Sequence, residues 1–222
     1  MERQTGLILA VLSALLSACG GGSSSAPTTY NAQAAYKSFL SAARTLNLAG
    51  TASNGSPLSL SWTVAPAGAG TFPLTSVAGQ RVDSSIVIRS GATVLASGSQ
   101  QAYFGADFVG LGSVRADGSC SQSSASAFPV AAEVGQTGTL GVATIYQTCS
   151  LAAARLGTIT GTWSIEQINM GVYLCSNSTL RDAAGTAVST ESDCIEISPE
   201  GTVGTRAVIT TNVSGSKVVF AN

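Results

Sequence analysis

Residues 46–64 read Leu-Asn-Leu-Ala-Gly-Thr-Ala-Ser-Asn-Gly-Ser-Pro-Leu-Ser-Leu-Ser-Trp-Thr-Val, and this stretch carries the clearest indication of the fold. Apolar residues alternate with polar ones before and after Ser53-Asn54-Gly55-Ser56. A period of two is typical of β-strands with one buried face, and Asn-Gly is typical of the tight turn between antiparallel strands. The stretch therefore predicts an antiparallel hairpin.

Short runs of the same character follow along the chain, and Gly or Pro separates nearly all of them. They cover residues 84–89, 93–97, 102–104, 139–148, 158–168, 172–175, 194–197, 206–211 and 217–220. Many short strands with turn residues between them favour an antiparallel β-sandwich or β-barrel. We expect one mainly β domain over residues 30–222. A division into two β sub-domains near residues 105–112 is the alternative, because the four distal cysteines all lie in the second half.

One short helix is expected at the start of this domain, over residues 32–44. Tyr36, Phe39, Leu40 and Ala43 have the i, i+3, i+4, i+7 spacing that places side chains on one face of an α-helix. We expect this face to pack against the β-domain rather than against a partner.

The N-terminus carries a different kind of information. Residues 7–16 are almost wholly apolar. This run is shorter than the roughly 20 residues that a membrane-spanning helix needs, so residues 1–18 are expected to be a signal peptide. The sequence Leu16-Ser17-Ala18-Cys19-Gly20 resembles the bacterial lipobox. That resemblance implies cleavage before Cys19 and a lipid on the Cys19 thiol.

The lipoprotein resemblance also implies an address. Lipoproteins carry a diacylglycerol and an amide-linked acyl chain, and two or more chains anchor a protein stably. The membrane is thus an expected partner, through Cys19. In Gram-negative lipoproteins an Asp directly after the lipidated cysteine resembles an inner-membrane retention signal. This chain has Gly20 at that position, which favours the outer membrane. Residues 19–29 are expected to form a flexible Gly/Ser tether with a reach of about 15–20 Å.

Four cysteines remain after Cys19, and an even number in an exported protein favours disulfides. The sequence leaves three pairings open. Pairing of neighbours would give Cys120–Cys149 and Cys175–Cys194. No Cys-x-x-Cys spacing occurs, so a thiol or metal site is not expected.

Composition excludes several classes of function. The chain contains no histidine, which rules out Ser-His-Asp and Cys-His nucleophile systems and His-based zinc sites. No P-loop or strand-linked Gly-x-Gly-x-x-Gly indicates a nucleotide cofactor. Charged residues make up 9% of the chain, and without a Lys/Arg cluster a nucleic-acid partner is not expected. We therefore predict no cofactor, no metal and no enzymatic activity.

Three weak candidate sites remain. Ser214-Gly215-Ser216-Lys217 fits the Ser-x-x-Lys pattern of serine–lysine acyl enzymes, but it lies in an expected turn rather than at the start of a helix. The second candidate is an acidic stretch with the members Asp182, Glu191, Asp193, Glu196 and Glu200. We expect this acidic stretch to be solvated surface, with a calcium site or a catalytic carboxylate pair as alternatives. Gly161-Thr162-Trp163 resembles the Gly-x-Trp of lipocalins, although in that family it lies on the first strand.

Taken together, residues 7–25 resemble the uncharacterised proteobacterial lipoproteins that join a Cys-Gly-Gly-Gly-Ser start to a disulfide-bearing β-rich domain. We expect an outer-membrane lipoprotein whose β-domain serves binding or envelope structure without catalysis, with an envelope protein as a candidate partner. One alternative is a carrier of a small apolar ligand, with a cavity beside Trp62 or Trp163. A second is a carboxylate-pair hydrolase.

Overall fold

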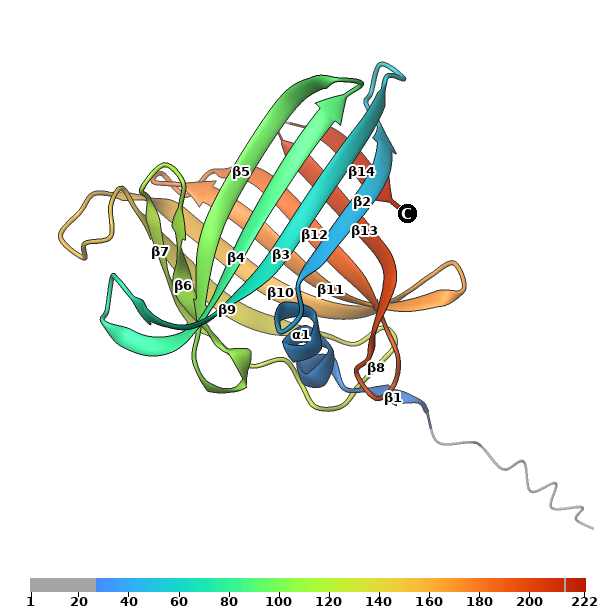
Figure 1. The fold of residues 1–222 in the computed structure, drawn as a ribbon, viewed down its shortest axis with the longest axis horizontal. Coiled ribbons are helices and arrows are strands. Elements are labelled where there is room, and N and C mark those ends of the chain that lie inside the picture. Colours follow the sequence, from blue (N-terminus) through green and yellow to red (C-terminus); the bar gives the residue numbers. More distant parts are fainter. Residues whose placement is uncertain (1–26, 214) are drawn as a thin grey trace, which may run out of the picture.

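The computed structural model describes residues 27–213 and 215–222. The expected signal peptide, Cys19 and most of the expected tether lie outside this part of the chain. The described residues are mainly β, with one short N-terminal helix and two disulfides, which confirms the predicted fold class. Of the two predicted architectures the structure is the barrel: twelve of the described strands form one closed antiparallel ring (Figure 1).

The barrel is an up-and-down meander in which each strand pairs with its neighbours in the chain, and β9 follows β7 in the ring because β8 pairs with β1 instead. In chain order the elements are β1 (Thr29–Tyr30), α1 (Ala32–Leu40), β2 (Arg44–Thr51), β3 (Pro57–Phe72), β4 (Val77–Ser90), β5 (Thr93–Phe104), the 3₁₀ turn η1 (Ala106–Phe108), β6 (Gly110–Arg115), β7 (Cys120–Ala125), β8 (Ala132–Glu133), β9 (Thr137–Tyr146), β10 (Arg155–Ile168), β11 (Gly171–Asp182), β12 (Ala187–Ile197), β13 (Val203–Val213) and β14 (Ser216–Ala221).

The predicted hairpin is present as β2 and β3, which pair from Arg44 opposite Val64 to Thr51 opposite Pro57. Its alternation separates the inside of the barrel from the outside. Leu48 and Leu60 are buried in a cluster with residues of β13 and β14, whereas Thr45 and Asn47 are exposed. Burial of this inward apolar face contributes about 25 cal/mol for each Å² removed from water and holds the ring together.

Several strands are longer than the sequence predicted. Residues 84–89 lie within a strand that covers Val77–Ser90, and the runs at 93–97 and 102–104 belong to one strand, β5. Backbone pairing with β4 continues through the polar residues between these two runs. β6 and β7 were not predicted, because Ser and Gly supply much of their sequence and no apolar alternation marks them.

The predicted helix is shorter than expected: it ends at Leu40, and Arg44 is already the first residue of β2. The end is stabilised from outside the helix, since Arg44 donates through Nε to the Phe39 carbonyl and through Nη2 to the Ser38 carbonyl, both at 3.3 Å. These bonds satisfy carbonyls that a helix leaves free in its last turn. Ala43 is therefore not part of the apolar helix face.

Helix α1 closes one end of the barrel, beside β1 and β8 (Figure 1). Asn31 caps its N-terminus by accepting a 2.9 Å hydrogen bond from the Ala34 amide. The turn between β12 and β13 packs closely against it, since a Cβ on Gly201 would lie 2.7 Å from that of Ala34. Ala32 and Ala35 are completely buried. No helix in the described part of the chain is long and apolar enough to cross a membrane.

The ring is continuous across residues 105–112, where the sequence left a division into two sub-domains open. β5 ends just before that segment and β6 begins within it, and the two strands pair directly, from Gln100 opposite Arg115 to Phe104 opposite Gly110. The seam between β14 and β2 closes the ring with two residue pairs, Phe220 opposite Gly50 and Ala221 opposite Ala49. The strands of both halves thus belong to one barrel.

Both disulfides join neighbouring cysteines, as the pairing of neighbours would give. Cys175 and Cys194 are directly opposite each other on β11 and β12 and lie in a small buried cluster with Tyr173. Cys120, at the start of β7, is bonded to Cys149 in the loop after β9. Each bond therefore fixes strands or loops that are adjacent in the ring.

Candidate functional site

A cavity of about 180 Å³ lies inside the barrel, next to α1. Its wall combines side chains from the helix with inward-facing side chains of β3, β4, β5, β11 and β12, and one from the segment between β7 and β8. The lining residues are Tyr36, Phe39, Leu40, Trp62, Val64, Val82, Ser84, Ile86, Gln100, Ala102, Phe104, Phe128, Leu174, Ser176, Glu191, Asp193 and Ile195. An engineered apolar cavity of about 150 Å³ binds benzene, so this space can hold a small organic molecule.

Five aromatic rings surround the cavity and pack against one another. The ring of Tyr36 lies 4.5 Å from that of Phe128 and 6.2 Å from that of Phe104, between centroids. The rings of Phe39 and Trp62 are 5.0 Å apart. Such pairs hold each other in place beyond the effect of their burial, so the apolar part of the cavity is largely preformed.

The barrel interior is filled on one side and open on another. Between β2, β3, β13 and β14 it is packed with side chains that include Leu60 and Phe220. Every residue of β5 from Thr93 to Gln101 is exposed, whichever face of the strand it occupies. The inner face of this half of β5 is therefore uncovered, and because Gln100 lines the cavity, solvent reaches the cavity from the end of the barrel opposite α1.

Two members of the acidic stretch, Glu191 and Asp193, line the cavity from one strand, β12. Residues two apart on a strand share a face, and Asp193 is in phase with Ile195, a buried core residue. Asp193 pairs with Ser176 on β11 and with Ile209 on β13, so neither adjacent strand places a cation opposite it. The expectation that the acidic stretch is solvated surface is wrong for these two residues.

The carboxyl group of Asp193 is held in an unfavourable place for a charge. Its Oδ1 atom is shielded from solvent and has no hydrogen-bond partner. Burial raises the pKa of Asp193 well above its ordinary value, and the nearby carboxyl group of Glu191 raises it further. Burial, and secondarily the charge of Asp193, raises the pKa of Tyr36 to about 12, so the phenol stays protonated. Asp193 as a whole is half-buried and lines the cavity.

The other acidic candidates lie away from the cavity. Asp182 accepts 2.9 Å hydrogen bonds from the Ala184 and Thr186 amides and so shapes the β11–β12 turn. Glu196 accepts a 3.0 Å bond from Nε of Arg206. This guanidinium lowers the pKa of the Glu196 carboxyl. Exposed Glu200 accepts a 2.8 Å bond from Ser198. These three serve turns and surface pairing, as expected of solvated loop charge.

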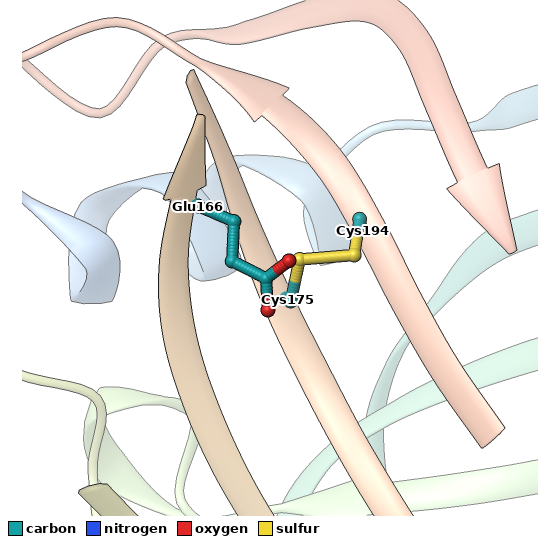
Figure 2. A group of neighbouring side chains, drawn as sticks. All are labelled: Glu166, Cys175 and Cys194. Atoms are coloured by element: carbon teal, nitrogen blue, oxygen red, sulfur yellow. A yellow bond between two sulfur atoms is a disulfide. The ribbon is translucent and has the colours of Figure 1, made fainter. Parts of the chain in front are cut away.

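Glu166, Cys175 and Cys194 form a compact group of donor atoms on β10, β11 and β12, and Figure 2 shows the Glu166 carboxylate beside the sulfur atoms. Both sulfur atoms are joined in the disulfide, so neither is a thiolate that could bind a metal. The Glu166 carboxylate instead accepts a 2.6 Å hydrogen bond from Ser164 Oγ. The group is structural in this oxidised state.

The remaining sequence candidates are placed as follows. Trp62 lines the cavity, whereas Trp163 packs against the core beside Gly138 and is not among the lining residues. Ser214 of the Ser-x-x-Lys pattern and the lipidation candidate Cys19 lie outside the described residues, and Lys217 is exposed on β14.

Comparison of the chain with protein-family models, curated proteins and solved structures found no match.

Proposed function

We propose that this protein is a lipid-anchored binding protein of the bacterial outer membrane, whose barrel holds a small and largely apolar molecule between α1 and the inward faces of β3, β4, β5, β11 and β12. The observation that carries the proposal is the cavity of about 180 Å³ with its aromatic lining. Ligand pockets are typically apolar concavities with a few placed polar groups. Gln100, Asp193 and Glu191 supply such groups here.

A binding role without catalysis fits the cavity better than hydrolysis does. Glycoside hydrolysis uses two carboxyl groups on opposite sides of the bond that breaks. Glu191 and Asp193 stand two residues apart on one strand and reach the cavity from the same wall. This pair can orient or neutralise a ligand group, but it does not enclose a bond.

The anchor gives the barrel an orientation in this proposal. The described chain enters the domain at β1, on the side of the barrel that α1 closes (Figure 1). A lipid on Cys19 would therefore hold the closed end nearest the membrane and leave the uncovered half of β5 facing away from it. Outward residues such as Asn47 on β2 and Ser59 on β3 are polar and exposed, which suits a barrel beside a bilayer rather than within one.

Ligand binding is tested by tryptophan emission. Titration with 2-phenylethanol, a neutral molecule sized for the cavity, is expected to change the emission saturably, with a dissociation constant of about 0.1–1 mM. Trp62→Phe should abolish the change, because Trp62 lines the cavity. Trp163→Phe is the matched control and should keep it. Emission that stays constant, or changes linearly without saturation, would contradict binding in this cavity.

The anchor is tested by fractionation. Cys19→Ser removes the thiol that the lipobox resemblance assigns to lipid, so the protein is expected to move from the membrane fraction to the soluble envelope fraction, or to accumulate as uncleaved precursor. Cys149→Ser, which spares Cys19, should remain with the membrane. If Cys19→Ser fractionates with the membrane in its mature form, the lipid anchor is refuted.

A further inference from the structure

We infer that the ligand carries a protonated amine, which the carboxyl groups of Asp193 and Glu191 bind while its apolar part lies among the aromatic rings of the cavity. This inference rests on the proposed function and names the chemical class of the ligand. It depends on three observations about charge, hydrogen bonding and the neighbouring rings.

The first observation is an uncompensated charge. Two carboxyl groups line the cavity, and none of the described residues that form its wall is Lys or Arg. The titratable groups facing Asp193 are Glu191 on its own strand and Tyr36 on α1, and neither brings a positive charge. The facing strands β4, β5 and β11 contribute Ser84, Gln100 and Ser176. A cation is therefore the group that this wall lacks.

The second observation is an unsatisfied acceptor. Buried polar atoms are nearly always hydrogen-bonded, and an exception calls for an explanation. Oδ1 of Asp193 is shielded from solvent and receives no hydrogen bond from the protein. An ammonium group offers three donors and a charge, and it would satisfy this atom and the neighbouring Glu191 carboxyl together.

The third observation concerns the aromatic lining. Ring faces attract cations, and the attraction increases where water is excluded. The rings of Tyr36, Trp62 and Phe128 surround the same cavity as the two carboxyl groups. The ring of Phe39 already has the Arg44 guanidinium 5.7 Å from its centroid. A carboxylate ligand would meet the negative charge of this carboxyl pair, and a neutral ligand would supply no positive charge to balance it. The cavity therefore discriminates in favour of an amphiphilic amine.

The test compares three molecules with the same phenylethyl body and different charge: 2-phenylethylamine, 2-phenylethanol and 3-phenylpropionate. Affinities are measured at pH 7.5 by calorimetry and by Trp62 emission. The amine is expected to bind about 10- to 100-fold more tightly than the alcohol, and the propionate more weakly than both. Asp193→Asn and Glu191→Gln should each remove most of the advantage of the amine over the alcohol.

Titration gives a second readout. An alkylamine, like the Lys side chain, stays protonated below about pH 9, so the charge of the ligand is constant over the measured range. The Asp193 carboxylate takes up a proton as the pH falls, and its raised pKa places this step at a higher pH than for an ordinary Asp. Amine affinity should therefore decrease at low pH, whereas alcohol affinity should not change. In Asp193→Asn this decrease should become smaller. Glu166→Gln, on the exposed outer side of β10, is the matched control and should behave as the wild type.

The outcomes separate the two proposals. Equal affinities for amine and alcohol, or tighter binding of the propionate, would overturn the inference about charge and leave the binding function standing. An amine advantage that survives both substitutions would overturn the assignment to Asp193 and Glu191. If none of the three molecules binds, both the binding function and the inferred ligand class are wrong.

Discussion

Removal of both disulfides is expected to lower the free energy of unfolding by about 6–7 kcal/mol. The bonds close loops with sequence separations of 29 and 19 residues. By the loop-entropy relation these are worth about 3.5 and 3 kcal/mol, mainly by restricting the unfolded chain. The loops do not overlap in sequence, so the two contributions should be nearly additive. Typical domains are stable by about 5–15 kcal/mol, so little stability would remain.

This expectation is checked by denaturant unfolding of the wild type and of two double variants, Cys120→Ala with Cys149→Ala and Cys175→Ala with Cys194→Ala. Each double variant should lose about half of the total effect, with the slightly larger loss for the longer loop. Addition of a reductant during unfolding should bring the wild type to the midpoint of the four-cysteine variant. An unchanged midpoint under reducing and unfolding conditions would show that the bonds do not stabilise the fold.

Gly112→Ala is expected to destabilise the barrel by about 3–5 kcal/mol or to prevent folding. Gly112 lies on β6 with φ +150°, a conformation that side chains rarely adopt. A Cβ there would lie 2.0 Å from the Ser121 carbonyl oxygen and 2.5 Å from Cζ of Phe72. Phe72 is completely buried, so its ring has little room to move away, and the carbonyl belongs to the β7 backbone.

Gly98→Ala is the matched control for this substitution. Gly98 is also a strand glycine, but it lies in the exposed half of β5, its φ is not positive, and a Cβ there would meet nothing within 4 Å. Thermal unfolding should therefore leave Gly98→Ala within about 0.5 kcal/mol of the wild type. Similar losses for the two variants would mean that close packing at Gly112 is not what limits the substitution.

The parts of the fold that the sequence predicted are those in which local chemistry and tertiary packing agree. The Asn54-Gly55 turn and the alternation around it gave the β2–β3 hairpin with its correct inward face. The helix was extended too far because Ala43 continued the apolar spacing, whereas pairing of Arg44 with Val64 draws that segment into the sheet. Propensity and periodicity contain no information about such a partner.

The choice between sandwich and barrel could not be made from periodicity, because the inward and outward alternation of strands is the same in both. What decides it is the pairing of β14 with β2, a contact between residues far apart in the sequence. β6 and β7 are not predictable for a related reason. Their Ser- and Gly-rich sequences show no alternation of apolar and polar residues, and their place in the sheet depends on hydrogen bonds with the neighbouring strands β5 and β9.

The candidate site was only partly predictable. The sequence suggested a cavity beside one of the tryptophans, and the structure places Trp62 on a cavity. The sequence does contain a signal for the inward position of Asp193, which is two residues from Ile195 and four from Ile197, so that the three side chains share one face of a strand. The density of acidic residues in a stretch of sequence says nothing about which face of a strand each carboxyl group occupies.

The seam between β14 and β2 has a consequence for the order of events during synthesis. A chain emerges from the ribosome N-terminal end first. β2 is among the first strands to appear, but its second neighbour in the ring arrives with Phe220, almost at the end of the described chain. Until then the sheet has two free edges, on β2 and on the most recent strand, and such edges pair readily with other chains. A nascent barrel of this design therefore exposes two unpaired strand edges until its last strand arrives.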